Sequence, residues 1–116
     1  MKIFLHGGAM QDILDMANRL GLMIKNTEAC KEFERLAAAV ENDKDASSLL
    51  NKYNEIAETI QKKHESGAVV EKYEQEMFKV LTETLRGNSL LIEYLKARER
   101  YMDLLVQIHR SMENAM

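Results

Sequence analysis

The reactive side chains in this sequence are few and widely spaced. Cys30 is its one cysteine, and no histidine lies close to it along the chain. A catalytic thiol needs a neighbouring base, so we interpret Cys30 as a small buried hydrophobic residue. Since one thiol can form neither an internal disulfide nor a metal cage, the sequence predicts a cytoplasmic protein in a reducing environment.

His109 and Glu113 stand one helical turn apart, a spacing at which a histidine and a carboxylate can share a metal ion. Two ligands are too few for a stable site, so we interpret His109, and likewise His64, as packed or half-exposed histidines. Glycine-rich phosphate loops and the HExxH and GxSxG motifs are absent from the sequence. We therefore expect neither a metal nor another cofactor, and no enzymatic activity.

Arg98 is a charged residue in an apolar setting, about 20° from the centre of the helical stripe that begins at Leu91. Its guanidinium could anchor a partner's carboxylate through paired hydrogen bonds. Alternatively, its aliphatic stem covers the core while its head reaches water, or it pairs with an acidic group inside an oligomer seam.

Composition restricts the elements that can position these residues. The 116 residues include no proline or tryptophan and only 5 glycines, which disfavours turn-rich β folds. Hydrophobic residues make up 46% and charged residues 30%, enough for a core and a solvated surface. The net charge of -3 provides no basic footprint for direct nucleic-acid binding. No apolar run reaches the roughly 18 residues of a membrane-inserted helix.

Apolar periodicity predicts an all-α fold of about five helices in an antiparallel hairpin or bundle arrangement. The third and fifth helices are expected to be long, and Gly67 and Gly87 to end the third and fourth. The first helix is expected over about residues 11–25, and the second begins after a cap at Thr27. The third is expected over 45–65 with Asp43 or Asp45 as its cap, and the fourth over 70–85. The fifth begins at a cap formed by Asn88 or Ser89.

The first ten residues have no clear place in this pattern. We interpret residues 1–10 as a weakly ordered arm, a mis-assigned start or a remnant of cloning, and residues 11–116 as a single helical domain.

The fifth predicted helix carries an apolar arc of about 180°, whereas packing on one neighbour needs about 100°. We expect two neighbours, one of them from another subunit, and so a homo-oligomer that is a dimer or larger. The four tyrosines follow helical stripes and are interpreted as core or interface residues: Tyr53, Tyr73, Tyr94 and Tyr101. The predicted partner or oligomer interface comprises Tyr94, Leu95, Arg98, Tyr101, Met102, Leu105, Ile108 and His109.

Two stretches carry a family resemblance: "VENDKDASSLLNKYNEI" (40–56) and "NSLLIEYLKARERYMDLLVQI" (88–108). The first is similar to the pattern V-x-x-D-x-x-A-x-x-L-L-x-x-F/Y, and the second to N-x-L-I-x-x-Y-L-x-A-x-x-R-F/Y-x-x-L-L-x-x-I. Over about residues 11–116 the chain therefore resembles the YlbF/YmcA family, which includes the YheA-type proteins of Gram-positive bacteria.

The resemblance implies a small, all-helical, self-associating cytoplasmic regulator. Better-known members join a complex that assists a membrane-tethered endoribonuclease, and their loss disturbs competence, sporulation and biofilm formation. Some family complexes hold iron–sulfur clusters through cysteines, but Cys30 is alone here, so no cluster is expected. We expect a non-enzymatic regulatory protein with paralogues or ribonuclease-complex proteins as partners. The alternatives are a structural homo-oligomer of unassigned function and a small metal-dependent hydrolase.

Overall fold

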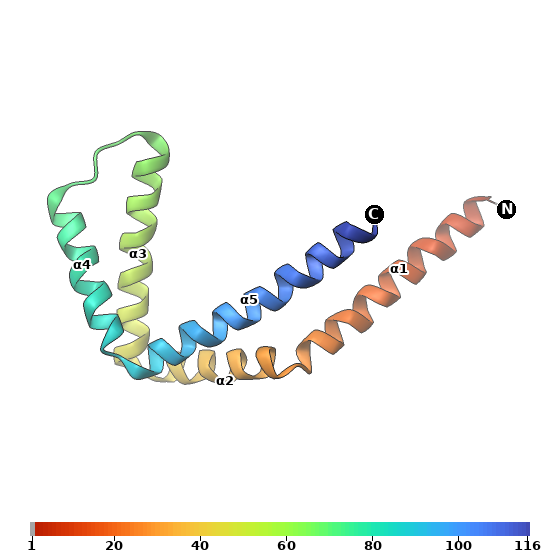
Figure 1. Cartoon of the computed structure of the whole chain (residues 1–116), viewed down its shortest axis with the longest axis horizontal. Coiled ribbons are helices and arrows are strands. Elements are labelled where there is room, and N and C mark those ends of the chain that lie inside the picture. The colour runs from red at the N-terminus through yellow and green to blue at the C-terminus, as the bar shows by residue number, and fades with distance from the viewer. Residues whose placement is uncertain (1) are drawn as a thin grey trace.

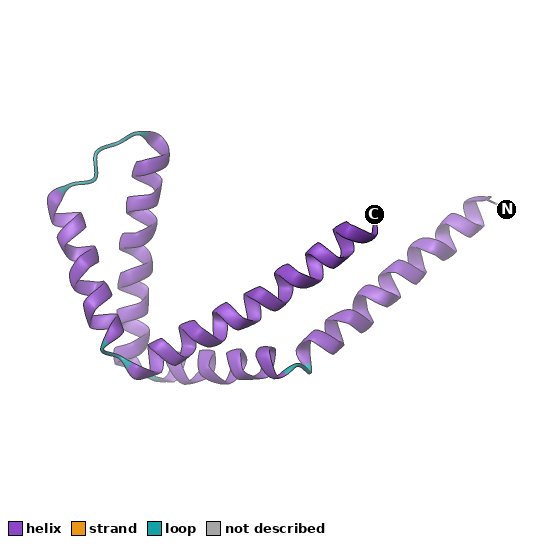
Figure 2. Cartoon of the chain, viewed as in Figure 1, coloured by secondary structure: helices purple, strands orange, loops and turns teal. Residues whose placement is uncertain are grey.

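The computed structural model describes the backbone of residues 2–116 and the side chains of residues 8–116. This part of the chain forms five α-helices and no strand, which confirms the all-α prediction (Figures 1 and 2). The third and fifth helices are long, as predicted. The helices are α1 (Lys2–Lys25), α2 (Glu28–Asn42), α3 (Lys44–Ser66), α4 (Lys72–Arg86) and α5 (Ser89–Ala115).

The first helix begins earlier than the sequence predicted. We expected it to start at Gln11, whereas α1 already begins at Lys2. Good helix formers and apolar residues precede Gln11, and setting residues 1–10 apart as an arm or remnant gave them too little weight. The predicted weak order of residues 1–10 concerns mainly residues 1–7, whose side chains lie outside the described part of the structure. This prediction, and that of a single domain over residues 11–116, therefore stay predictions.

The helix ends follow the caps that the sequence contains. A side-chain oxygen at the start of α2, α3 and α5 accepts a hydrogen bond from an otherwise unpaired backbone N–H of the first turn. Gly67 ends α3 with a φ of 75°, a left-handed conformation that glycine adopts without a steric penalty. The three capping bonds run from Cys30 N–H to Thr27 (3.2 Å), from Ala46 N–H to Asp43 (3.0 Å) and from Leu91 N–H to Asn88 (3.0 Å).

The two candidate caps of α3 can be told apart by mutation. We expect Asp43→Ala to lower the free energy of unfolding by about 1 kcal/mol, because the N–H of Ala46 loses its acceptor. Asp45→Ala should cost less, since Asp45 lies inside the first turn and contributes only through the helix dipole. Urea denaturation followed by circular dichroism measures both. Equal effects would show that Asp43 acts only through its charge.

The helices form two limbs that meet at a corner (Figure 1). In the hairpin limb, α3 and α4 pack antiparallel to each other. In the long limb, α2 packs antiparallel to α5, and α1 continues beyond the start of α2. Val40, Ala46, Leu85 and Leu91 form a buried cluster with one residue from each of α2 to α5. The core therefore lies at the corner where the two limbs join.

An ion pair holds the outer end of the hairpin limb together. The Glu74 carboxylate, only 5% exposed, accepts hydrogen bonds from Lys63 Nζ at 2.5 Å and from the N–H of Glu71 at 2.9 Å. The Lys63 ammonium, together with this backbone N–H, holds the pKa of the Glu74 carboxyl below its usual range. The same contact raises the pKa of Lys63.

This ion pair should make the stability of the protein pH-dependent. A carboxyl whose pKa is lower in the folded state contributes its full stabilisation above its unfolded pKa of about 4.3 and loses it as the pH falls through its folded pKa. We expect the urea midpoint of the wild type to fall more steeply from pH 7 to pH 3 than that of Glu74→Gln. Glu58→Gln is the matched control, because Glu58 pairs with Lys62 at an exposed position. Parallel wild-type and Glu74→Gln profiles would contradict the expectation.

The chain is too extended to bury a full core by itself. Its radius of gyration is 20.2 Å, whereas a compact domain of this length has about 13 Å. Its accessible surface is 9299 Å², compared with about 6,500 Å² for a compact monomer of the same mass. Much apolar surface therefore has no partner within the chain.

Candidate interaction surface

The first half of the predicted α5 interface packs within the chain. Tyr94 and Tyr101 stack on either side of Phe33 of α2, with ring centroids 5.7 and 5.2 Å apart. Both tyrosines and Leu95 are half-buried. Their apolar surface packs mainly in the contact between α2 and α5. The helix α2 is thus one of the two neighbours expected for α5.

The charged members of the predicted interface lie in solvent. Arg98 and Met102 are exposed, so Arg98 is not buried in a seam of this chain. His109 bonds Glu113 through Nε2 at 2.7 Å, with side chains 68% and 57% exposed. His64 is also exposed, so neither histidine is packed in the core. Helix ends extend beyond the small core, which leaves both histidines uncovered.

The described residues contain no cluster of three or more histidine, cysteine, aspartate or glutamate side chains that could hold a metal ion. His109 and Glu113 therefore remain a surface pair, and their geometry suits a hydrogen bond between exposed groups.

Cys30 is buried, as predicted, with 5% of its surface exposed. Its Sγ donates a hydrogen bond to the Glu34 carboxylate at 3.6 Å. Burial and the negative charge of Glu34 raise the pKa of the Cys30 thiol. Because the thiolate is the nucleophilic form, this environment suppresses reactivity and favours a packing role.

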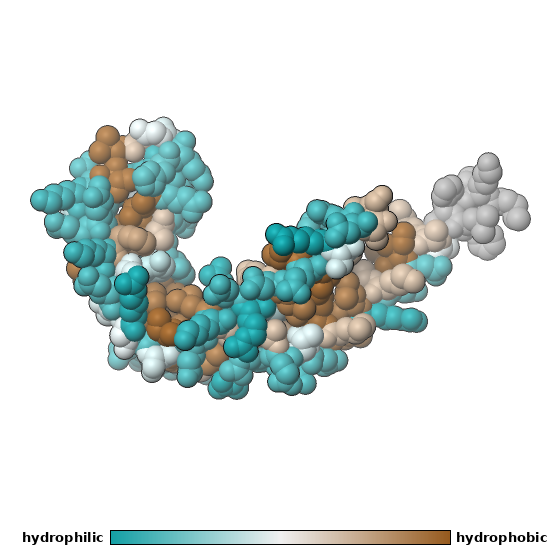
Figure 3. Space-filling view, viewed as in Figure 1, coloured by the Kyte–Doolittle hydropathy of each residue, from teal (hydrophilic) through white to brown (hydrophobic). Residues whose placement is uncertain are grey.

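An apolar cleft runs between α1 and the C-terminal half of α5. Figure 3 shows hydrophobic surface gathered between these two helices. Two adjoining hollows of about 510 and 230 Å³ share Leu20 and Met112. We call this surface the α1–α5 cleft, and it is defined by Ile13, Met16, Ala17, Leu20, Leu104, Ile108 and Met112.

The α1 wall of this cleft has little support inside the chain. Within the described residues, α1 makes substantial contact only with α2, which follows it directly. Ile13 is 65% and Met16 67% exposed, although they lie on the apolar stripe of α1. An isolated helix gains little from propensity alone and is stabilised mainly by burying such a face. The exposed stripe is therefore a surface that a partner would cover.

The sequence contains the apolar stripes of both walls of the cleft, but it does not show that the two lie close together. The stripe from Ile13 to Leu20 was recognisable as one helix face, and Ile108 was among the predicted interface residues. Met112 lies on the Leu91 stripe of the fifth helix and could have been added to them. The contribution of α1 was missed, because periodicity shows which face of a helix is apolar but not which helix lies opposite.

The fold and this surface define a small all-α protein with a large unpaired apolar cleft. A family model described as "Control of competence regulator ComK, YlbF/YmcA" matches residues 13–116. The chain belongs to the YlbF/YmcA family, which confirms the resemblance seen in the sequence.

Relatives and solved structures agree with this assignment. A UPF0342 protein of Streptococcus thermophilus is 29% identical over 101 residues, covering 87% of this chain and 90% of the relative. A UPF0342 protein of Streptococcus suis is 26% identical over 99 residues, covering 85% and 88%. A protein of unknown function (DUF964) from Bacillus stearothermophilus shares the fold, with a TM-score of 0.76, 15% identity, and coverage of 90% and 91%.

A second solved structure is that of Bacillus subtilis RicA in complex with RicF. It has a TM-score of 0.67 and 14% identity, and covers 90% of this chain and 92% of the other. At these identities the two structures establish the shared fold. Among the described residues, no helix has the length and apolar character needed to cross a membrane.

Proposed function

We propose that this protein is a non-enzymatic regulatory protein of the cytoplasm that self-associates through the α1–α5 cleft and works by binding other proteins. The observation that carries the proposal is the unpaired apolar cleft in a chain whose surface far exceeds that of a compact monomer.

A second copy of the chain fits the cleft in both area and charge. The whole chain exposes about 2,800 Å² more surface than a compact monomer, which is enough to supply the roughly 1,000 to 2,500 Å² that an obligate dimer buries per subunit. Residues 90–116 contain as many basic as acidic residues, so two copies of α5 do not repel each other strongly. In a two-fold dimer, the stripe of each α1 can enter the cleft of its partner.

The regulatory part of the proposal rests on the family. The matching family model is described as a control of the competence regulator ComK, and RicA, which shares the fold, was solved in complex with RicF. We propose a paralogue or a component of a ribonuclease complex as the partner of this chain, with a role in messenger processing. The single buried cysteine fits a reducing compartment.

Self-association is tested by sedimentation equilibrium of the purified wild type at micromolar concentration. A dimer or larger species is expected. A monomer with fully helical, cooperatively folded α1 would overturn this part of the proposal.

The regulatory role is tested by affinity purification of the tagged protein at native level from its host, followed by mass spectrometry. Paralogues or ribonuclease-complex components are the expected partners. Recovery of the protein alone as a stable oligomer would instead support the second candidate, a structural homo-oligomer, which the apolar cleft also favours.

A further inference from the structure

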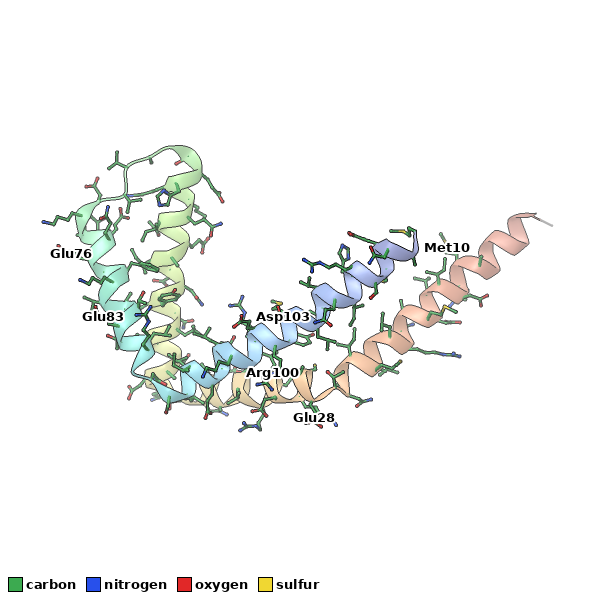
Figure 4. All side chains as sticks on the ribbon, viewed as in Figure 1. Met10, Glu28, Glu76, Glu83, Arg100 and Asp103 are labelled. Carbon is green, nitrogen blue, oxygen red and sulfur yellow. The ribbon has the colours of Figure 1, made fainter. Side chains whose placement is uncertain are left out.

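Methionine side chains lie on both walls of the α1–α5 cleft. Met16 from α1 and Met112 from α5 line the same hollow of about 230 Å³ and are 67% and 50% exposed. Met10, which is 66% exposed, lies on α1 one turn before Ile13, another residue of that hollow (Figure 4). Cys30, by contrast, is buried. A dissolved oxidant therefore meets the thioethers of this cleft in the free chain rather than the thiol.

The hollow offers no hydrogen-bonding side chain to a polar neighbour. Besides the two methionines it is lined by Ile13, Ala17 and Leu20. The backbone N–H groups of these residues are used inside the helix. An apolar, flexible thioether suits such a setting, whereas a sulfoxide is polar and disrupts methionine-rich contacts. The same two positions that favour association when reduced would oppose it when oxidised.

We propose that oxidation of Met16 and Met112 to methionine sulfoxide blocks self-association through the α1–α5 cleft. The proposal rests on the proposed function, in which a second copy of the chain covers this cleft. The oxidant is a peroxide. Each thioether sulfur donates an electron pair to one oxygen of hydrogen peroxide, an S–O bond forms, the O–O bond breaks and water leaves. The sulfur loses the two electrons that the peroxide gains.

Oxidation and assembly compete for the same side chains. Met16 and Met112 are open to solvent in the free chain, and the α1 stripe of a second copy would cover them. Once a chain is oxidised, each sulfoxide oxygen would have to give up water without gaining a donor, so the chain stays a monomer. Methionine sulfoxide reductases return the thioether, which makes the change reversible.

The test compares the dissociation constants of untreated and peroxide-treated full-length protein by sedimentation equilibrium. Peptide mass spectrometry first shows that Met16 and Met112 carry one oxygen each, and circular dichroism shows that the helices persist. Oxidation should raise the dissociation constant at least ~10-fold, because several unpaired polar oxygens enter one contact. Methionine sulfoxide reductases for both epimers, with dithiothreitol, should restore the original constant, whereas dithiothreitol alone should not.

The double variant Met16→Leu/Met112→Leu keeps both side chains apolar and of similar size but cannot form the sulfoxides. It should associate like the wild type before and after peroxide. The matched control Met77→Leu/Met116→Leu removes two exposed methionines outside the cleft and should stay as sensitive as the wild type.

Two results would overturn the inference alone: an oxidised wild type that associates as before, or an equal loss of association in oxidised Met16→Leu/Met112→Leu. A wild type that is monomeric before oxidation would overturn the proposed self-association as well, so the two failures are distinguishable.

Discussion

Leu91→Ala is expected to lower the free energy of unfolding by about 3–5 kcal/mol, the largest stability effect of any single truncation in this chain. Leu91 is 0% exposed and belongs to the cluster that joins α2, α3, α4 and α5. Removing its side chain loses apolar burial and leaves a cavity that rigid helices on all sides cannot close. Urea denaturation at fixed protein concentration measures the change.

The matched control is Leu22→Ala, the same truncation at a side chain that is 63% exposed. It should shift the free energy of unfolding by about 0.5 kcal/mol or less. Similar losses in the two variants would mean that the corner is not the stability centre of the protein.

Leu20→Glu is expected to convert the proposed oligomer into monomers and to raise the dissociation constant at least ~100-fold. Leu20 lines both hollows of the α1–α5 cleft, so a partner helix there would enclose its side chain. An unpaired carboxylate buried in an apolar contact costs several kcal/mol, and two-fold symmetry would apply this cost twice. Sedimentation equilibrium over a range of concentrations measures the constant.

Leu22→Glu controls for the general effect of a charge on α1. Leu22 is exposed and lies about 200° around the helix from Leu20, on the side away from the cleft. The substitution Leu22→Glu therefore introduces the same charge at a position outside the proposed contact. It should leave the dissociation constant within about threefold of the wild type. If Leu22→Glu dissociates the oligomer as strongly as Leu20→Glu, another face of α1 mediates self-association.

Helix positions were predictable because the signals that set them are local. Asp43 and Asn88 cap the N–H groups three residues ahead, and Gly67 adopts the left-handed conformation that ends α3. Each interaction lies within a few residues, so it can be read from the chain. The start of α1 was the exception, since Gln11 was taken as a boundary although no cap stands there.

Individual side-chain environments were less predictable. Tyr94 and Tyr101 were placed in apolar settings by periodicity, and Cys30 by the absence of a neighbouring base, and they are half-buried or buried. His64 and Tyr73 fall on stripes as well, yet both are exposed. An apolar stripe marks the helix face that prefers burial. Whether another helix of the same chain packs over a given residue of that stripe depends on how far the residue lies from the core at the corner.

The sequence by itself determined the class of fold, the helix ends that carry caps or a terminating glycine, and the apolar faces, because turn chemistry and a period of 3.6 residues are properties of short segments. Only the tertiary structure decided which faces meet. The core cluster at the corner buries one face of each of the helices α2 to α5. The apolar stripes around Leu20 and Met77 are not covered by another helix of the chain. The α1–α5 cleft, on which the proposed function rests, lies between helices from the two ends of the sequence, so only their placement in the long limb brings its walls together.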